Sequence, residues 1–467
     1  MRNAHDVIVI GGGPAGEHCA GALADGGMRV ALIERALVGG ECSYWACIPS
    51  KTLLRPGEAA HGANQAAGIA KVDIGAALAW RDFMVSGYSD AGGERWLAHH
   101  GIELIRGSGR LSGTGAVDVD GNRHTATHIV IATGSDPFVP PVPGLHGLDG
   151  TWTNREMTGM KAVPRRLLIL GGGPVGVEMA QAVHRLGGEV VLIERAAHLF
   201  PHEPRPLGEA LGETLRREGI ELALGVQATR LRREGIHYLL ELNDGRTLSG
   251  ERLFVAAGRR ARVEGLGLET VGIEAKASGI PVDARLRAGE RLWAIGDVNG
   301  IWQLTHVGKY QARIVAANIL GEPREANYEA VPRVTFTDPQ AASVGAAAAT
   351  YRATALAAHV ARSATYSRST NESGFLTLLS NGERLTGAYA LGPEAGEWLQ
   401  QATLAIRARV PLEVLLDTIQ PFPTFSEIYA DALNALHQQI RQRRVQVPAA
   451  VPIHYTHHAH ALPPLAP

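Results

Sequence analysis

The sequence predicts an α/β protein with two Rossmann-like domains and an additional α+β domain at the C-terminal end. The chain has 467 residues, which is too long for one ordinary hydrophobic core. A glycine-rich segment at residues 8–16 returns at residues 168–176, at an offset of 160. In both copies an apolar strand-like run precedes the glycines and a helix-like stretch follows them, which is typical of βαβ units in a parallel sheet.

The first glycine segment opens the first βαβ unit. Gly11, Gly13 and Gly16 form the pattern G-x-G-x-x-G, which allows a tight turn and a close approach of the backbone to a pyrophosphate. The next apolar run ends at Glu34, 18 residues beyond Gly16, where a carboxylate can accept hydrogen bonds from ribose hydroxyls.

The second segment repeats this pattern, with the acid at the same spacing, in Gly171, Gly173, Gly176 and Glu194. One such motif is weak evidence, because glycines also serve close helix packing. Two copies in register predict two dinucleotide sites. A carboxylate at Glu194 suits the free 2'-hydroxyl of NADH and repels a 2'-phosphate, although the adjacent Arg195 could receive one. NAD(H) is therefore favoured over NADP(H).

A C-x4-C segment follows the first unit and leads into a predicted helix with Pro49 in its first turn. Cys42 and Cys47 near a helix N-terminus would have stabilised thiolates and be reactive. The spacing is also compatible with the alternative that both cysteines are buried and reduced. Three cysteines in all are too few for a secreted disulfide framework, and Cys19 on the first glycine helix is predicted to pack in the core.

Several further segments accompany these motifs: residues 49–51 (Pro-Ser-Lys), 131–134 (Ile-Ala-Thr-Gly), 255–259 (Val-Ala-Ala-Gly-Arg) and 294–297 (Ala-Ile-Gly-Asp). Together they resemble the pyridine nucleotide-disulfide oxidoreductase family, which includes lipoamide dehydrogenase, glutathione reductase, mercuric reductase and soluble transhydrogenase. The resemblance runs from about residue 5 to about residue 445. It implies an FAD-dependent enzyme that forms a homodimer.

By that resemblance the first glycine motif and Glu34 bind the adenosine half of FAD, Asp297 holds its ribityl chain, and the second motif binds NAD(P)H. The resemblance implies these cofactor contacts in full: Gly11, Gly13, Pro14, Ala15, Gly16, Glu34, Arg35, Gly40, Glu41, Cys42, Lys51, Ala132, Thr133, Gly134, Gly171, Gly173, Pro174, Val175, Gly176, Glu194, Arg195, Ala257, Gly258, Arg259, Gly296 and Asp297.

The resemblance also assigns catalytic roles. Cys47 would lie against the flavin as a thiolate, and Cys42 would be the outer thiol that attacks substrate. Lys51 and Glu178 would form an ion pair beside the flavin, where a cation favours the negative charge of reduction. A solvated surface pair is the alternative for these two side chains.

The domain boundaries follow from the same resemblance. We expect an FAD-binding domain in residues 1–150, continued in a central part at 266–330, an NAD(P)-binding domain at 151–265 and a dimerisation domain at 331–448. Residues 449–467 form a tail rich in His, Pro and Ala, predicted to be disordered. Four histidines in this tail could bind a transition metal, but we expect no metal site.

One position departs from the family pattern. Most of its disulfide reductases carry His-Pro-Thr-x-x-Glu near the C-terminus and contribute this histidine to the other subunit's active site. This chain has Phe422 there and keeps the histidine's usual partner, Glu427, which the resemblance implies as a catalytic residue. A positioned proton-transfer group is worth about 100- to 10,000-fold in rate. Soluble transhydrogenase also has an aromatic residue here but lacks the first cysteine, and mercuric reductase has a C-terminal cysteine pair that this chain lacks.

Three functions follow as hypotheses. The first is transfer of electrons from NADH through FAD to the cysteine pair and on to a small disulfide or other thiol-reactive acceptor. The alternative is direct reduction by the flavin of a quinone, a metal ion, a second nicotinamide or a biosynthetic small molecule, which Phe422 would suit. A third is a flavin-binding protein that acts through partners, which the retained Lys51 and Glu178 disfavour.

The bulk composition excludes other classes. The chain has 45 basic and 46 acidic side chains, which gives no electrostatic reason to bind nucleic acid or an anionic membrane. The N-terminus lacks the features of a secretory signal, and no apolar run is long enough to span a membrane. We therefore expect a cytoplasmic protein.

Overall fold

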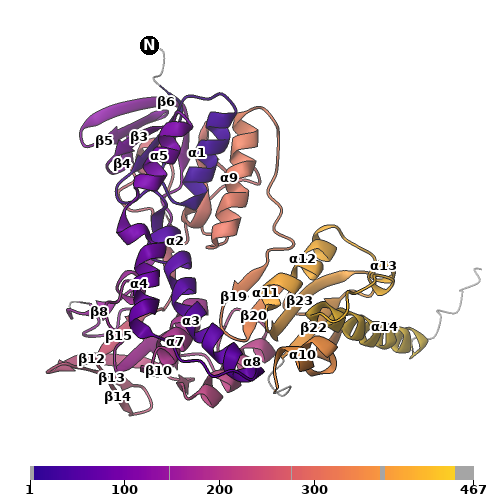
Figure 1. Ribbon diagram of the computed structural model, residues 1–467. Coiled ribbons are helices and arrows are strands. Elements are labelled where there is room, and N and C mark those ends of the chain that lie inside the picture. The colour runs from indigo at the N-terminus through magenta and orange to yellow at the C-terminus, as the bar shows by residue number, and fades with distance from the viewer. Residues whose placement is uncertain (1–4, 147, 275, 369–373, 447–467) are drawn as a thin grey trace, which may run out of the picture.

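The computed structural model describes residues 5–446 except 147, 275 and 369–373. The predicted tail at 449–467 lies outside the described residues. Figure 1 shows a first sheet with helices α1 and α9 beside it, a second sheet with its helices, and a C-terminal unit. Among the described residues, no helix is both long enough and apolar enough to cross a membrane.

The first sheet has a parallel centre and contains these strands in spatial order: β17 (Arg287–Gly289), β18 (Leu292–Ala294), β6 (Asn122–Ile131), β1 (His5–Ile10), β2 (Val30–Glu34) and β3 (Glu103–Arg106). β5 (Ala116–Val119) pairs antiparallel with β6, and β4 (Gly109–Leu111) pairs antiparallel with β5, which extends the sheet. The helices of this unit are α1 (Pro14–Asp25), α5 (Ala91–His99) and α9 (Thr305–Ile319). Strands from residues 287–294 thus complete a sheet that begins at residue 5.

The second sheet is parallel throughout, in the order β11 (Glu221–Leu224), β10 (Glu189–Glu194), β9 (Arg166–Leu170), β15 (Arg252–Val255) and β8 (Thr151–Trp152). Helices α6 (Asn154–Thr158), α7 (Pro174–Arg185) and α8 (Arg205–Glu218) belong to it, with an antiparallel sheet of β12 (Ala228–Glu234), β13 (His237–Leu242) and β14 (Thr247–Gly250). A short ribbon of β7 (Ser135–Pro137) and β16 (Arg259–Ala261) lies at the junction of the two units.

The third unit is an antiparallel sheet in the order β19 (Arg333–Thr335), β20 (Gln340–Gly345), β23 (Leu385–Gly392), β22 (Phe375–Ser380) and β21 (Tyr351–Leu356). Its helices are α10 (Ala361–Tyr366), α11 (Ala395–Trp398), α12 (Gln400–Arg407), α13 (Leu412–Leu416) and α14 (Ile428–Gln446). Alternate strand residues and the helices enclose a separate apolar core. The α/β fold class with an α+β C-terminal unit is confirmed.

The internal repeat of the sequence is also a repeat in the structure. Helices α1 and α7 both have 12 residues, and their bounds differ by the predicted offset. Their N-cap residues, Gly13 and Gly173, have the same extended conformation, with φ of -77° and -78°. Gly11 and Gly171 both need positive φ, at 109° and 121°, so a side chain at either position would be strained.

Two helices connect these units around the cysteines. α2 (Gly40–Tyr44) carries Cys42, and α3 (Cys47–Ala66) begins at Cys47 with Pro49 in its first turn. α3 packs against α4 (Ile74–Met84) and α7, so that the cysteine segment lies between the first two sheets. Cys19 is fully buried in the core around α1, as predicted.

Candidate active site

One cavity of about 980 Å³ joins the two glycine turns to the cysteine pair. Nearly all of the predicted site residues line it. The exceptions are Gly16, Gly176 and Glu427, which do not contribute to this lining within the described chain. Gly16 and Gly176 instead let each helix pack on its own turn, because a Cβ atom there would lie 1.9 Å from the carbonyl oxygen of Gly11 or Gly171.

The acids at the ends of β2 and β10 are held in the same way. Glu34 accepts hydrogen bonds from the backbone amides of Gly12 and Ala36, both at 2.7 Å. Glu194 accepts them from Gly172 at 2.7 Å and Ala196 at 2.8 Å. The backbone therefore fixes each carboxylate beside its glycine turn, where a ribose would lie.

The first turn fits the pyrophosphate of FAD. A Cβ atom built on Gly13 would meet nothing within 4 Å, so the space before the N-terminus of α1 is open. Free amide groups at that N-terminus favour an anion. Asp297, at the carboxyl end of β18, also lines the cavity and accepts a 2.6 Å hydrogen bond from the Ser135 hydroxyl. The second turn has the same open space at Gly173.

This geometry predicts that alanine at one glycine of the second turn lowers fold stability, whereas alanine at another weakens NADH binding. Gly176→Ala places a methyl group against the Gly171 carbonyl and should destabilise the fold by about 1–3 kcal/mol. Gly173→Ala meets no protein atom, so the melting temperature should hold while NADH binding weakens. Thermal melting and NADH titration of both variants check this. Equal melting temperatures for the two variants would contradict it.

The two cysteines share one hydroxyl. Thr305, the first residue of α9, has its Oγ1 3.4 Å from the Sγ of Cys42 and 3.4 Å from the Sγ of Cys47. Both cysteines are free thiols. The α9 N-terminus and the α3 N-terminus thus meet at the sulfur atoms, which favours a thiolate there.

The two thiols differ in acidity. A hydrogen bond from Cys42 lowers the pKa of Cys47 to about 6, with further help from Thr305 and the charge of Lys51 against burial. The same hydrogen bond, together with burial, raises the pKa of Cys42. Cys47 is therefore the thiolate of the pair at neutral pH, and Cys42 holds the proton.

A pH prediction follows from the lowered pKa of Cys47. The thiolate should be present above pH 6 and should be lost as the pH falls through about 6. Titrating the anaerobic, reduced enzyme and following the long-wavelength absorption of a thiolate against flavin measures this. A midpoint near the ordinary thiol value of about 8.5 would contradict it.

Lys51 and Glu178 form the ion pair that the family resemblance implied. Lys51 Nζ lies 2.5 Å from Glu178 Oε2, and Glu178 is buried. The other carboxylate oxygen accepts a 2.9 Å hydrogen bond from the amide of Phe336, whose ring lies under the Lys51 ammonium at 4.7 Å. The pair is thus not a solvated surface pair, and it lines the same cavity as the cysteines.

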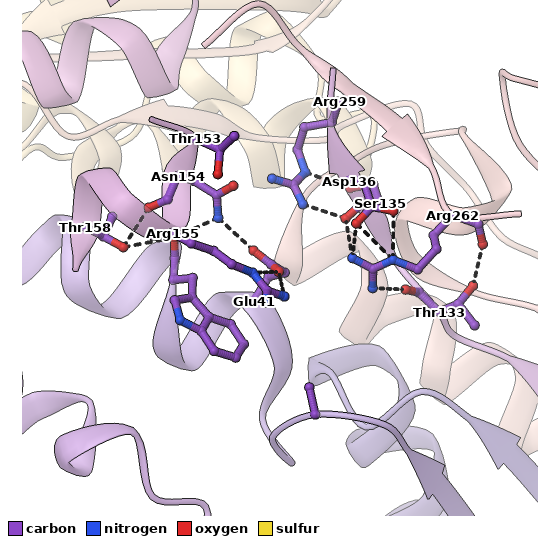
Figure 2. Close-up of polar contacts among 12 residues, drawn as sticks. Glu41, Thr133, Ser135, Asp136, Thr153, Asn154, Arg155, Thr158, Arg259 and Arg262 are labelled. Atoms are coloured by element: carbon purple, nitrogen blue, oxygen red, sulfur yellow. Dashed lines mark hydrogen bonds and ion pairs between the residues drawn. The ribbon is translucent and has the colours of Figure 1, made fainter. Parts of the chain in front are cut away.

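A polar network holds the cysteine segment to the second unit. Figure 2 shows the side chains of Asn154 and Arg155 both reaching Glu41. The Glu41 carboxylate lies 2.7 Å from Asn154 Nδ2 and 2.6 Å from an Arg155 guanidinium nitrogen. Arg155 also lies over the Trp45 ring at 4.1 Å. Because Glu41 is occupied by these partners, the structure gives it a positioning role beside its place in the cavity wall.

A second network lies on the other side of the cavity. Figure 2 shows Arg259 and Arg262 converging on the strand that contains Ser135. Arg259 donates to the Ser135 hydroxyl at 2.7 Å, and that hydroxyl donates to Asp297. Arg262 pairs with Asp136 and donates to the Thr133 carbonyl at 2.9 Å. These contacts fix residues 133–136 against residues 259–262.

Sequence reasoning missed several of these residues, among them Thr305, Asn154, Arg155 and Arg262. Thr305 could have been found as a polar residue that opens a helical pattern eight residues after Asp297. Asn154 and Arg155 follow Thr153, which with Glu156 forms a recognisable capping box. Nothing in the sequence indicated their contact with Glu41.

The departure at Phe422 lies at the surface of this chain. Phe422 is 75% exposed, and Glu427 accepts a 3.1 Å hydrogen bond from the amide of Thr424 in a capping box. Among the residues that the structure describes, neither Phe422 nor Glu427 lines the cavity of its own chain. In residues 5–446, apart from the gaps at 147, 275 and 369–373, no cluster of three potential metal ligands is found, and the histidine-rich tail lies outside the described residues.

The fold and the cavity define an FAD-dependent oxidoreductase that uses a pyridine nucleotide. The chain belongs to the pyridine nucleotide-disulphide oxidoreductase family: the family model matches residues 5–312, and the model of the family's dimerisation domain matches residues 331–433. The second match suggests a homodimer.

Named relatives differ in their substrates. The dihydrolipoyl dehydrogenase of Thermus scotoductus is 34% identical over 465 residues, covering 93% of this chain and 98% of the relative. The mercuric reductase of Bacillus cereus is 32% identical over 446 residues, covering 91% of this chain and 70% of the relative.

Solved structures of similar fold include a flavoprotein disulfide reductase. The Cu(II) complex of the HOCl-induced flavoprotein disulfide reductase RclA from Escherichia coli superposes with a TM-score of 0.81 at 28% identity, over 91% of this chain and 98% of that one. LpdA from Mycobacterium tuberculosis gives a TM-score of 0.81 at 26% identity, over 92% of this chain and 99% of that one.

Proposed function

We propose that the enzyme passes electrons from NADH through FAD to the Cys42 and Cys47 pair and on to a disulfide or another thiol-reactive acceptor. The observation that carries this proposal is that both sulfur atoms lie 3.4 Å from one hydroxyl, in the cavity that also contains both glycine turns. When bound, FAD supplies the relay between the two-electron donor and the cysteines.

Each group of residues would hold a different part of the cofactors. Gly13 and the α1 N-terminus would hold the FAD pyrophosphate, Glu34 its ribose and Asp297 its ribityl chain. Gly173 and Glu194 would hold the nicotinamide dinucleotide. Lys51 would stabilise negative charge close to Cys47, and Glu178 keeps its ammonium in place through the 2.5 Å ion pair.

The cysteines would then carry out two exchange steps. The Cys42 sulfur, once deprotonated, attacks one sulfur of the acceptor disulfide, forms a mixed disulfide and releases the first product thiolate. The Cys47 thiolate attacks the Cys42 sulfur, closes the Cys42–Cys47 disulfide and releases the second product. The two products take up two protons, one of them from Cys42.

Trapping of the reduced cysteines tests the proposal. Protein oxidised in air, and the same protein after anaerobic addition of NADH, are treated with iodoacetamide and analysed by peptide mass spectrometry. We expect Cys42 to be alkylated only after reduction, with buried Cys19 unmodified in both samples. Equal alkylation of Cys42 with and without NADH would exclude a redox cycle at this pair.

A second candidate is direct reduction by the flavin of a flat, uncharged acceptor. Phe422 favours it, because an exposed aromatic side chain in place of the histidine provides a stacking surface and no proton. Quinone reduction that is unchanged in Cys42→Ser protein would support this candidate over exchange at the cysteines.

We also propose NADH as the preferred donor, on the support of the buried Glu194. The ratio of kcat/KM for NADH over NADPH should fall about tenfold or more in Glu194→Ser, because a carboxylate that binds the ribose hydroxyls is removed. Steady-state assays with both donors measure this. Arg195→Gln, a change to the neighbouring exposed cation, should lower only the rate with NADPH. An unchanged ratio in Glu194→Ser would contradict the assignment.

Further proposals are the oligomeric state of the protein, its domain boundaries and its cellular compartment. We propose a homodimer formed through residues 331–448, with the partner subunit's Phe422 brought to the cysteine pair as the histidine is in the family. We also propose an FAD-binding domain at residues 1–150, continued at 266–330, and an NAD(P)-binding domain at 151–265. The three cysteines fit a reducing compartment, so we propose the cytoplasm.

A further inference from the structure

Helix α9 presents one face to the cysteine pair. Its first residue, Thr305, contacts both sulfur atoms at 3.4 Å. Lys309 lies four residues later, one turn along the same face, about 6 Å further along the axis. The intervening Gly308 packs on α1, since a Cβ atom there would lie 3.1 Å from the Cβ of Ala15. Figure 1 shows α1 and α9 side by side. The helix therefore holds Lys309 one turn from the residue that contacts Cys42.

The charged groups around Lys309 do not neutralise its ammonium, which can therefore stabilise the Cys42 thiolate. Its charge acts on Glu17 and His18 of α1, and Arg313 follows one turn later on its own helix. Burial raises the pKa of Glu17 to about 7, so this carboxyl is only partly ionised at neutral pH. Among the described residues, Lys309 forms no ion pair within 4.0 Å. It is half-buried, which limits the screening of its charge by water.

The effect on Cys42 has a clear direction. The hydrogen bond with Cys47 and burial raise the pKa of Cys42, whereas the Thr305 hydroxyl and the Lys309 ammonium lower it. The Cys42 thiol must lose its proton to attack, and the histidine that would take this proton in the family is replaced by Phe422. A fixed positive charge meets the same need by stabilising the thiolate.

We propose that Lys309 is a positioning residue for thiol exchange, which stabilises the Cys42 thiolate through its charge and so offsets part of the loss of the histidine. This inference rests on the proposed function of the cysteine pair. The same ammonium stabilises the thiolate that leaves the acceptor during the first exchange step. It neither accepts nor donates the proton, so its effect is electrostatic and depends on a cation at this position.

The test compares Lys309→Met with the conservative Lys309→Arg in the full-length holoenzyme. Each protein is reduced anaerobically with NADH, and the rate of Cys42 alkylation by iodoacetamide is measured across pH by peptide mass spectrometry. We expect alkylation at neutral pH to be about three- to tenfold slower in Lys309→Met, with its midpoint shifted to higher pH. Lys309→Arg should restore the wild-type midpoint. Arg313→Gln, an exposed cation one turn further from Thr305, is the matched control and should leave it unchanged.

The outcomes separate the two proposals. A wild-type protein whose Cys42 reacts equally with and without NADH overturns the proposed function and this inference with it. A reduction-dependent wild type with an unchanged midpoint in Lys309→Met overturns the inference alone. A midpoint in Lys309→Arg as high as that in Lys309→Met overturns it as well, because charge would not be the cause. Thermal melting and the flavin spectrum show that each variant is folded and loaded.

Discussion

Replacing Cys42 by serine should lower turnover with a disulfide acceptor by about a thousandfold or more, because a serine hydroxyl cannot replace a thiolate as nucleophile at neutral pH. The change is small in volume, and the contact between Cys47 and Thr305 remains to keep the segment in place. Reduction of the flavin by NADH should continue, since both glycine turns are untouched. Stopped-flow flavin reduction and steady-state acceptor assays measure the two parts separately.

Cys19→Ala is the matched control for this prediction. Cys19 is also a cysteine close to the first glycine turn, but it is fully buried, and burial raises the pKa of its thiol to about 12. Its loss should leave turnover within about twofold of wild type, since the thiol takes no part in exchange. Full turnover in Cys42→Ser would show that electrons leave from the flavin directly, and it would favour the quinone or metal acceptors.

Replacing Phe422 by histidine should increase disulfide reduction by about 100-fold, because it restores a proton-transfer group where the family has one. Glu427, the usual partner of that histidine, is already present and held in its capping box. Phe422 is 75% exposed in its own chain, so histidine there costs little stability. Steady-state reduction of a small disulfide, measured on the intact dimer, gives the result.

Phe422→Leu distinguishes proton transfer from the mere loss of an aromatic ring. We expect no gain in disulfide reduction with leucine, and a slower reaction with flat acceptors if Phe422 stacks on them. A histidine variant no faster than the leucine variant would mean that the natural acceptor needs no proton at this position. The first exchange step would then depend on charge alone.

The sequence predicted the parts of the site that lie within one local unit. The paired glycine turns, the acids at Glu34 and Glu194, and the helix that begins at Cys47 all follow from short patterns with a physical reason. The structure adds that backbone amides hold both acids in the same way. The contact between Lys51 and Glu178, 127 residues apart, was expected from the family resemblance and not from spacing.

Other contacts between distant segments could not be predicted from the sequence. Thr305 meets Cys47 across 258 residues of sequence, and Asn154 meets Glu41 across 113. Such contacts depend on how the two sheets are placed around the cysteine segment, which local patterns do not encode. Gly16 and Gly176 belong to the predicted glycine motifs, but they do not line the cavity. These two glycines instead allow each helix to pack on its own turn.

An anaerobic titration of the purified enzyme with NADH or dithionite tests the central claim most directly, by counting the electrons taken up per FAD while the visible spectrum is recorded. The account predicts uptake of more than two electrons, with a long-wavelength band at the two-electron stage from the Cys47 thiolate against oxidised flavin. Simple bleaching of the flavin that is complete at two electrons would contradict it, because the cysteine pair would then take no part in the redox cycle.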